Sequence, residues 1–296
     1  PLYKRSLAIR EKALGPDHPD TAVALNNLAG LCAATGRQRD SLLLMLRAQG
    51  IDGRLIDQVM GFTSEDQKMK FLATREGNLH IFLSLVSRSM KDGNTLERAL
   101  TVWLQRKGVV LEAQKRFQDA IALSDDPVLR EKSQELARTR AELSKLTFSG
   151  PGKEGPDAYR KKIAELEAHK EKLEADLSRL SDAFAKTRKV AKADTRQVAQ
   201  TLPKGSSLID FVKVSLFNFA AKGNEKKWFP PRYLVFILPA GGPDKVSFID
   251  LGDAGEIDRL IGTFKKNVTN YEGDPEGNEA SRISRRLHDL VFAPIK

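Results

Sequence analysis

Three apolar runs within residues 206–252 constrain the fold more than any other feature of this 296-residue chain. They read SSLIDFVKV, RYLVFILP and KVSFIDLG, and breaks rich in glycine, proline and asparagine separate them. Runs of this length and composition predict β-strands. Residues 233–238 are apolar throughout, which predicts a central strand covered on both faces. The tight-turn sequence at residues 241–244 predicts that the second and third strands are antiparallel neighbours.

The rest of the chain has helical periodicity. Residues before Leu202 are helical in pattern throughout, and two amphipathic patterns follow the strands, at residues 256–270 and 279–292. The predicted fold class is therefore mostly α with a C-terminal α/β part. Since a buried sheet needs a layer on each face and these two helices supply one, we expect at most half of an ordinary α/β domain here.

The N-terminal helices repeat with a period of 42 residues, from the set Leu2, Arg5, Ser6 and Ile9 to the set Leu44, Arg47, Ala48 and Ile51. Helix, glycine turn and helix at a fixed period are typical of a stacked helical repeat. The segment RSLAIREKALGPDHPDTAVALNNLAGLCAATGR resembles a tetratricopeptide repeat of the kinesin-light-chain type. The resemblance implies a peptide-binding groove, with Asn26 or Asn27 facing it. The alternative is that both asparagines only make local hydrogen bonds on a solvated helix.

Helical spacing continues after the repeat. Ser64 and Gln67 have the form of a capping box, and Asn94 with Glu97 predicts another helix start, so residues 51–125 should extend the solenoid or form a small bundle. Within residues 126–196, apolar residues recur at heptad positions on both sides of a Gly/Pro break, which predicts an antiparallel coiled-coil hairpin. The seam residues are Leu129, Leu136 and Leu143, then Ile163, Leu166, Lys170, Leu173, Leu177, Leu180 and Phe184. A spacer or intramolecular brace is its default role; a partner-binding arm or a dimer contact is the alternative.

The net charge of +10 raises the question of nucleic-acid binding. Along the hairpin, basic and acidic residues alternate, which is typical of a solvated face. The residues nearest to a basic patch for nucleic acid or a partner are Lys186, Arg188, Lys189, Lys192, Lys222, Lys226 and Lys227. Phe217, Phe219 and Trp228 flank the last three and could stack on a single strand. They more readily pin a strand-connecting loop, so the sequence disfavours direct nucleic-acid binding.

Cysteine, histidine and apolar content exclude several classes of protein. The single cysteine, Cys32, excludes an internal disulfide framework and fits a reducing cytoplasm. It lies on the apolar face of a repeat helix, where packing is its expected role. Four scattered histidines give no zinc-ligand spacing, so we expect neither a metal nor another cofactor. No apolar run is long enough to cross a membrane, and a membrane partner is not expected.

The order of all these segments resembles the CHAT family, bacterial caspase-like proteins in which a peptidase domain follows tetratricopeptide repeats. The stretches FLATREGNLHIFLSL, RKGVVLEA, LPKGSSLIDFVKV and RLHDLVFAPI carry the resemblance. It implies a cysteine endopeptidase regulated by a protein or ribonucleoprotein partner bound to the repeats or the hairpin. The family's catalytic His-Gly pair and Cys follow the segment matching RLHDLVFAPI, so no residue of this chain is assigned as catalytic. We expect them beyond Lys296, on a C-terminal remainder that would be a further partner.

Four domains are expected: a repeat at 1–50, a helical extension at 51–125, the hairpin at 126–196 and the N-terminal portion of a caspase-like α/β domain at 200–296. The first function hypothesis is the regulatory portion of a CHAT peptidase, which by itself should not cleave peptides because thiolate catalysis needs an imidazole within hydrogen-bond reach. The alternative is a non-catalytic scaffold of repeat and coiled coil.

Overall fold

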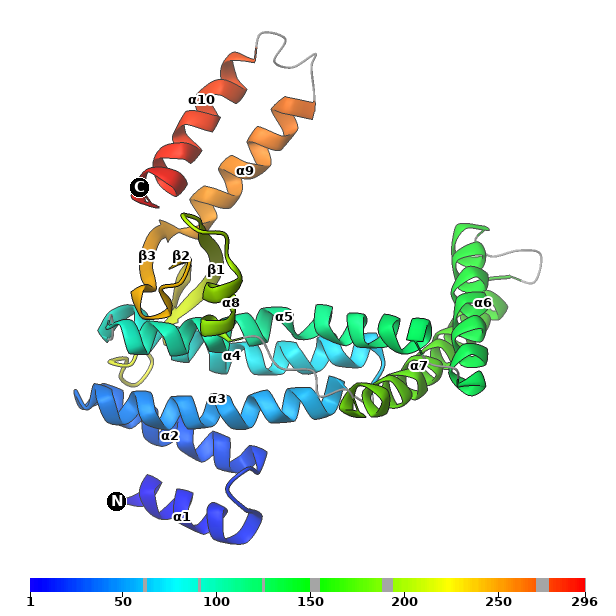
Figure 1. Cartoon of the computed structure of the whole chain (residues 1–296), viewed down its shortest axis with the longest axis horizontal. Helices are drawn as coiled ribbons and strands as arrows, with labels where there is room; N and C mark the ends of the chain where they lie inside the picture. Colours follow the sequence, from blue (N-terminus) through cyan, green and yellow to red (C-terminus); the bar gives the residue numbers. More distant parts are fainter. Residues whose placement is uncertain are drawn as a thin grey trace. The chain divides into compact units, whose positions relative to one another are not determined.

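The computed structural model describes residues 1–60, 63–89, 92–123, 126–149, 155–187, 194–269 and 277–295. These residues form ten α-helices and, near the C-terminus, one three-stranded antiparallel sheet, as the periodicity predicted (Figure 1). The chain divides into two compact units. The first unit comprises Pro1–Gln49, Gly77–Leu104 and Ala193–Lys296, and the second comprises Gly50–Glu76 and Gln105–Lys192. Helices α3, α4 and α5 each contribute to both units.

The helices begin where side chains can satisfy their free backbone amides. Helix α1 is Leu2–Leu14, α2 is Pro19–Ala34, α3 is Gln38–Met60, α4 is Glu65–Ser89 and α5 is Gly93–Leu123. The capping box before α4 is confirmed: the Gln67 amide donates to Ser64 Oγ at 3.3 Å, and the Ser64 amide donates to Gln67 Oε1 at 3.2 Å. The predicted cap of α5 was wrong. Asp92, not Asn94, accepts the Thr95 amide at 3.0 Å, because the helix begins one residue before Asn94.

The sheet consists of β1 Ser207–Phe217, β2 Trp228–Pro239 and β3 Ser247–Asp253, in the order β1-β2-β3. The apolar run at residues 233–238 is therefore the central strand, and the predicted antiparallel pairing of β2 with β3 is confirmed. Strand β1 also pairs with β2 in antiparallel orientation. Strand β2 starts earlier than its apolar run and includes Pro230 and Pro231. Proline lacks the amide of a two-sided ladder, and here β3 pairs only from Arg232 onward, so this part of β2 has one partner strand.

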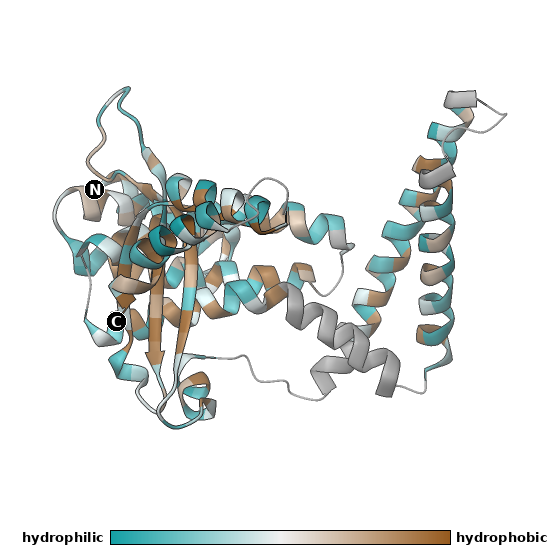
Figure 2. Cartoon of the chain, turned by 90° about the horizontal axis from the view of Figure 1, so that it is seen from above, coloured by the Kyte–Doolittle hydropathy of each residue, from teal (hydrophilic) through white to brown (hydrophobic). Residues whose placement is uncertain are grey.

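The hydrophobic core of the first unit joins the repeat helices to one face of the sheet. Its buried members come from α2 and α3, from α4 and α5, from the short helix α8 (Thr195–Thr201), and from β1 and β2. The apolar content of the strands is visible in Figure 2 as brown ribbon. Among the fully buried residues are Ala29 on α2, Phe82 on α4, Val214 on β1 and Leu234 on β2. The repeat helices and the sheet therefore share one continuous hydrophobic core.

The opposite face of the sheet is covered only in part. Helix α9, Ala254–Thr269, follows β3 directly and packs on β2, and α10, Asn278–Leu287, lies beside α9 (Figure 1). On this face Val235 is fully buried, whereas Ile209 and Phe211 of β1 keep 41% and 37% of their surface exposed. The two helices thus form the predicted covering layer, but they cover only part of this face.

The second unit contains the antiparallel hairpin of α6, Pro127–Ser149, and α7, Gly155–Thr187. Asp126 caps α6 by accepting the Val128 amide at 2.9 Å. The predicted heptad seam is the core of the hairpin, where Leu129, Leu136, Leu173 and Leu177 are buried and Leu180 packs against them. The buried ammonium of Lys68 donates to Ser178 Oγ at 2.8 Å, which joins the start of α4 to α7.

Candidate interaction surface

Helix α2 carries an exposed stripe that includes two large apolar side chains. His18 caps the helix by accepting the Asp20 amide on Nδ1 at 3.1 Å, and Pro19 occupies the first turn, where its missing amide costs nothing. One side of the helix, with Leu25, Ala29 and Cys32, is buried. On the other side Val23, Asn27 and Leu31 follow one another at i, i+4 and i+8, and Val23 and Leu31 are 42% and 37% exposed. We call these three residues the α2 stripe.

The two asparagines singled out from the sequence have different surroundings. Asn27 is exposed in the middle of the α2 stripe, whereas Asn26 is half-buried. The side-chain nitrogen Nδ2 of Asn26 is buried and has no hydrogen-bond partner among the residues that the structure describes. A buried amide without a partner is costly. Asn27 is thus the residue available to a ligand on this face.

Polar contacts fix the neighbours of α2. Arg47 of α3 forms an ion pair with Glu11 of α1 at 2.6 Å, and Arg10 of α1 donates to the carbonyl of Asp20 at 2.9 Å. Leu7 of α1 is buried. The hydroxyl of Ser41 on α3 donates to the carbonyl of Ala29 on α2 at 2.8 Å. The helix that carries the α2 stripe therefore has polar contacts with both α1 and α3.

The basic residues predicted as a patch do not all fall in the described part of the chain. Arg188, Lys189 and Lys192 lie outside the described residues, and so does the side chain of Lys186. Lys222, Lys226 and Lys227 are exposed in the loop between β1 and β2. This loop is pinned as expected: the ring of Phe217 is 5.2 Å from that of Phe219 and 5.0 Å from that of Trp228, edge to face in both pairs.

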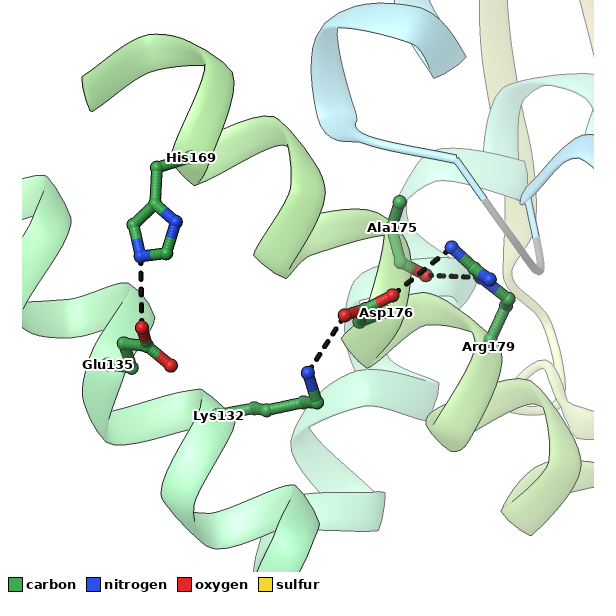
Figure 3. A network of polar contacts seen from close by, with 6 residues as sticks. All are labelled: Lys132, Glu135, His169, Ala175, Asp176 and Arg179. Carbon is green, nitrogen blue, oxygen red and sulfur yellow. Dashed lines mark hydrogen bonds and ion pairs between the residues drawn. The ribbon is translucent and has the colours of Figure 1, made fainter. Parts of the chain in front are cut away.

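Hydrogen bonds and ion pairs line the flank of the hairpin. His169 of α7 lies 3.0 Å from Glu135 of α6, and Lys132 Nζ lies 2.8 Å from Asp176 Oδ2 (Figure 3). Arg179 also contacts Asp176, at 3.1 Å. The hydrogen bond from Lys132 is the main cause that lowers the pKa of the Asp176 carboxyl. The His169–Glu135 and Lys132–Asp176 contacts join α6 to α7, whereas Arg179 and Asp176 both belong to α7. Such solvent-accessible pairs add at most about 1 kcal/mol each to the pairing of the two helices.

The titratable residues considered for chemistry are dispersed. Cys32 is buried among the apolar residues of α2, and its packing role is confirmed. His18 caps that helix, His169 is on the hairpin, and His288 stacks on Phe292 with ring centroids 6.3 Å apart. Within the described ranges, no group of three or more His, Cys, Asp and Glu side chains is placed to hold a metal ion. None of the helices found there has both the length and the hydropathy to cross a membrane.

Comparison with known proteins identifies the N-terminal part. The sequence model of the tetratricopeptide repeat family matches residues 1–52. Residues 1–52 form a tetratricopeptide repeat. Such repeats typically bind protein partners. No curated protein matches the chain, and no solved structure does either. Nothing in the comparisons indicates a CHAT domain in the residues that follow the repeat.

The sequence analysis identified only one residue of the α2 stripe. Asn27 was found because it lies in the LNNLA segment, but Val23 and Leu31 were not. Their spacing of four residues on either side of Asn27 was the available signal. This spacing was not informative by itself, because apolar residues also occupy the buried side of α2. Sequence periodicity therefore does not distinguish the buried side of the helix from the exposed one.

Proposed function

We propose that the tetratricopeptide repeat binds a peptide segment of a protein partner along the α2 stripe. Val23 and Leu31 offer apolar contact, and Asn27 between them offers a donor and an acceptor for the peptide backbone. Asn27 is available for this purpose because it is exposed. The combination of an apolar contact on each side and an amide at the centre supports binding of an extended peptide.

We further propose that the α/β part is the N-terminal portion of a CHAT-type caspase-like peptidase, and that peptide binding to the repeat regulates it. The observation that carries this proposal is the shared core: Ala33 of α2 and Met45 of α3 belong to the same buried cluster as Val212 of β1 and Phe236 of β2. Because interiors are close-packed, a displacement of α2 or α3 has to be accommodated by the sheet. A partner that prefers one arrangement of the repeat would thereby bias the arrangement of the strands.

The form of the sheet is consistent with a larger domain. Strand β2 is paired on both sides, while β1 and β3 each have one partner strand among the described residues. Ile209 and Phe211 leave apolar surface on the outer face. Further strands would therefore have to pair with β1 or β3, and further helices would cover the outer face. Both arrangements would protect edges and apolar surface that isolated sheets expose.

A non-catalytic scaffold is the second candidate. The observation that favours it is the tetratricopeptide repeat at residues 1–52, since such repeats typically bind protein partners. The two candidate functions make different predictions about the natural polypeptide downstream of Lys296. A natural polypeptide that continues with a His-Gly pair and a Cys, and that loses peptide cleavage when either is substituted, would support the peptidase. Cleavage that persists in both variants, or a natural product without these residues, would favour the scaffold.

Peptide selection tests the binding proposal directly. Random peptides displayed on phage would be selected on the wild-type chain, and their affinities measured for Asn27→Ala and Leu31→Glu variants. We expect losses of about fivefold for Asn27→Ala, since a hydrogen bond contributes about 1 kcal/mol, and larger losses for Leu31→Glu. Leu43→Glu is the matched control, because Leu43 is 60% exposed but lies on α3. Selected peptides that respond to Leu43→Glu and not to the α2 variants would refute this site.

A further inference from the structure

A second surface, separate from the α2 stripe, lies where α4 ends beside the sheet. Here the structure has an open cavity of about 370 Å³. Its lining includes Arg88 from the last turn of α4 together with Phe229, Pro230, Arg232, Asp250 and Asp253 from β2 and β3. Phe229 is 39% exposed and Pro230 beside it is exposed as well, so solvent reaches the apolar part of the lining. Exposed aromatic and arginine side chains together are typical of binding surfaces.

The guanidinium of Arg88 packs on an aromatic ring, and its N–H donors remain available to a ligand. Its guanidinium carbon lies 4.7 Å from the centroid of the Phe229 ring, in a cation–π contact. The guanidinium makes no ion pair or hydrogen bond with the residues that the structure describes, and the Arg88 side chain is exposed. A guanidinium donates in its own plane, so the contact with the ring leaves its N–H groups available for a planar acceptor such as a carboxylate.

The acidic residues of the cavity already have donors. Arg232 Nε lies 2.9 Å from both carboxylate oxygens of Asp250, and the Gly252 amide also donates to Asp250 at 2.9 Å. Asp253 accepts the Glu256 amide at 2.8 Å and caps the N-terminus of α9, where the helix dipole favours a negative charge. Of the two arginines named in the lining, Arg232 is paired with a carboxylate, whereas Arg88 contacts an aromatic ring and has no carboxylate partner among the described residues.

From this arrangement we infer that the cavity binds an acidic side chain of a peptide, with its carboxylate on Arg88. Phe229 and Pro230 supply apolar surface, so the preferred peptide has an apolar residue next to the acidic one. A nucleic-acid strand fits less well. One face of Phe229 is occupied by Arg88, which removes a stacking face for a base, and Asp250 and Asp253 would repel a chain of phosphates more strongly than a single carboxylate.

Short peptides test this inference on the full chain. Acetylated and amidated hexapeptides with a central Glu-Leu, Gln-Leu or Lys-Leu pair would be compared by ligand-observed NMR, with hexauridylate as a nucleic-acid probe. We expect the Glu-Leu peptide to bind at least fivefold more tightly than the Gln-Leu peptide. Arg88→Ala should remove that preference, Arg88→Lys should retain part of it, and Arg88→Glu should shift it to the Lys-Leu peptide.

Arg282→Ala is the matched control, because Arg282 is an exposed arginine on α10, and it should leave the preference unchanged. Since Arg88 is also exposed, the variants should retain the wild-type melting temperature, which circular dichroism would verify. Equal binding of the Glu-Leu and Gln-Leu peptides would overturn the inference. So would tighter, Arg88-dependent binding of hexauridylate, which would point to a nucleic acid instead.

Discussion

The phenol of Tyr233 donates a 2.6 Å hydrogen bond to Oδ1 of Asp258. The other carboxylate oxygen, Oδ2, accepts from Lys213 Nζ, also at 2.6 Å. Tyr233 is on β2, Lys213 is its partner on β1, and Asp258 is in the second turn of α9. One carboxylate therefore fastens two strands to the helix that covers the outer face of the sheet.

Replacement of Tyr233 by phenylalanine should destabilise the chain by about 1.5 kcal/mol, since it removes one hydrogen bond to a charged acceptor while the ring remains. Urea denaturation followed by circular dichroism would measure the free energy of unfolding. Tyr3→Phe is the control, because Tyr3 is 47% exposed on α1. An equal effect of the two substitutions would mean that the contact with Asp258 does not contribute to stability.

The same contact predicts two effects of pH. The hydrogen bond to Asp258, burial and the nearby negative charge raise the pKa of Tyr233 from 10.0 to about 12. A raised pKa means that this stabilisation is complete below pH 10 and is lost as the pH rises toward 12. For Asp258, the hydrogen bond from Lys213 and then that from Tyr233 lower the pKa below 3.8. Its contribution is present above that value and is lost as the pH falls through the lowered pKa.

Tyrosinate absorbance near 295 nm would measure the first effect. The difference between the titration curves of the wild type and Tyr233→Phe isolates Tyr233, and its midpoint should lie at about pH 12. In an Asp258→Asn background the midpoint should move toward the ordinary value, because the charged acceptor is gone. A midpoint that stays unchanged in this background would show that burial, not the carboxylate, determines the shift.

Ser84 is expected to be important for the junction between α4 and β1. It is fully buried, and its Oγ accepts the Phe217 amide at 2.7 Å. Ser84→Ala would leave that amide without an acceptor, at a cost of about 1–3 kcal/mol. Hydrogen exchange of the Phe217 amide should also accelerate. Ser87→Ala, three residues along the same helix, is the control and should change neither quantity by a comparable amount.

Lys170 should be a weak point of the hairpin seam. It occupies a heptad position and is half-buried, between Leu166 and the fully packed Leu173. Because its charge must reach solvent from a seam position, Lys170→Leu should raise stability by about 1 kcal/mol. Lys172→Leu, at an exposed position two residues later, should give no gain. A higher melting temperature for Lys170→Leu alone would support this assignment, while an equal gain from both would indicate a nonspecific effect.

Local patterns in the sequence predicted most of the elements, the central position of β2 and its antiparallel pairing with β3. Apolar runs between glycine- and proline-rich breaks located the strands, the capping box at Ser64 located the start of α4, and the heptads located the seam of α6 and α7. The start of α5 was missed by two residues. Asn94 and Asp92 are both competent caps, and the choice between them depends on where the preceding turn ends.

The sequence by itself determined the type and order of the elements, the repeat at residues 1–52 and the antiparallel hairpin, since these depend on periodicities within a few turns or strand residues. Only the tertiary structure decided which side of α2 stays open, that Asp258 joins Lys213 to Tyr233, and that Arg88 lies on Phe229. Those contacts connect residues far apart in the chain. They depend on strand register and on helix packing, and no local pattern records either one.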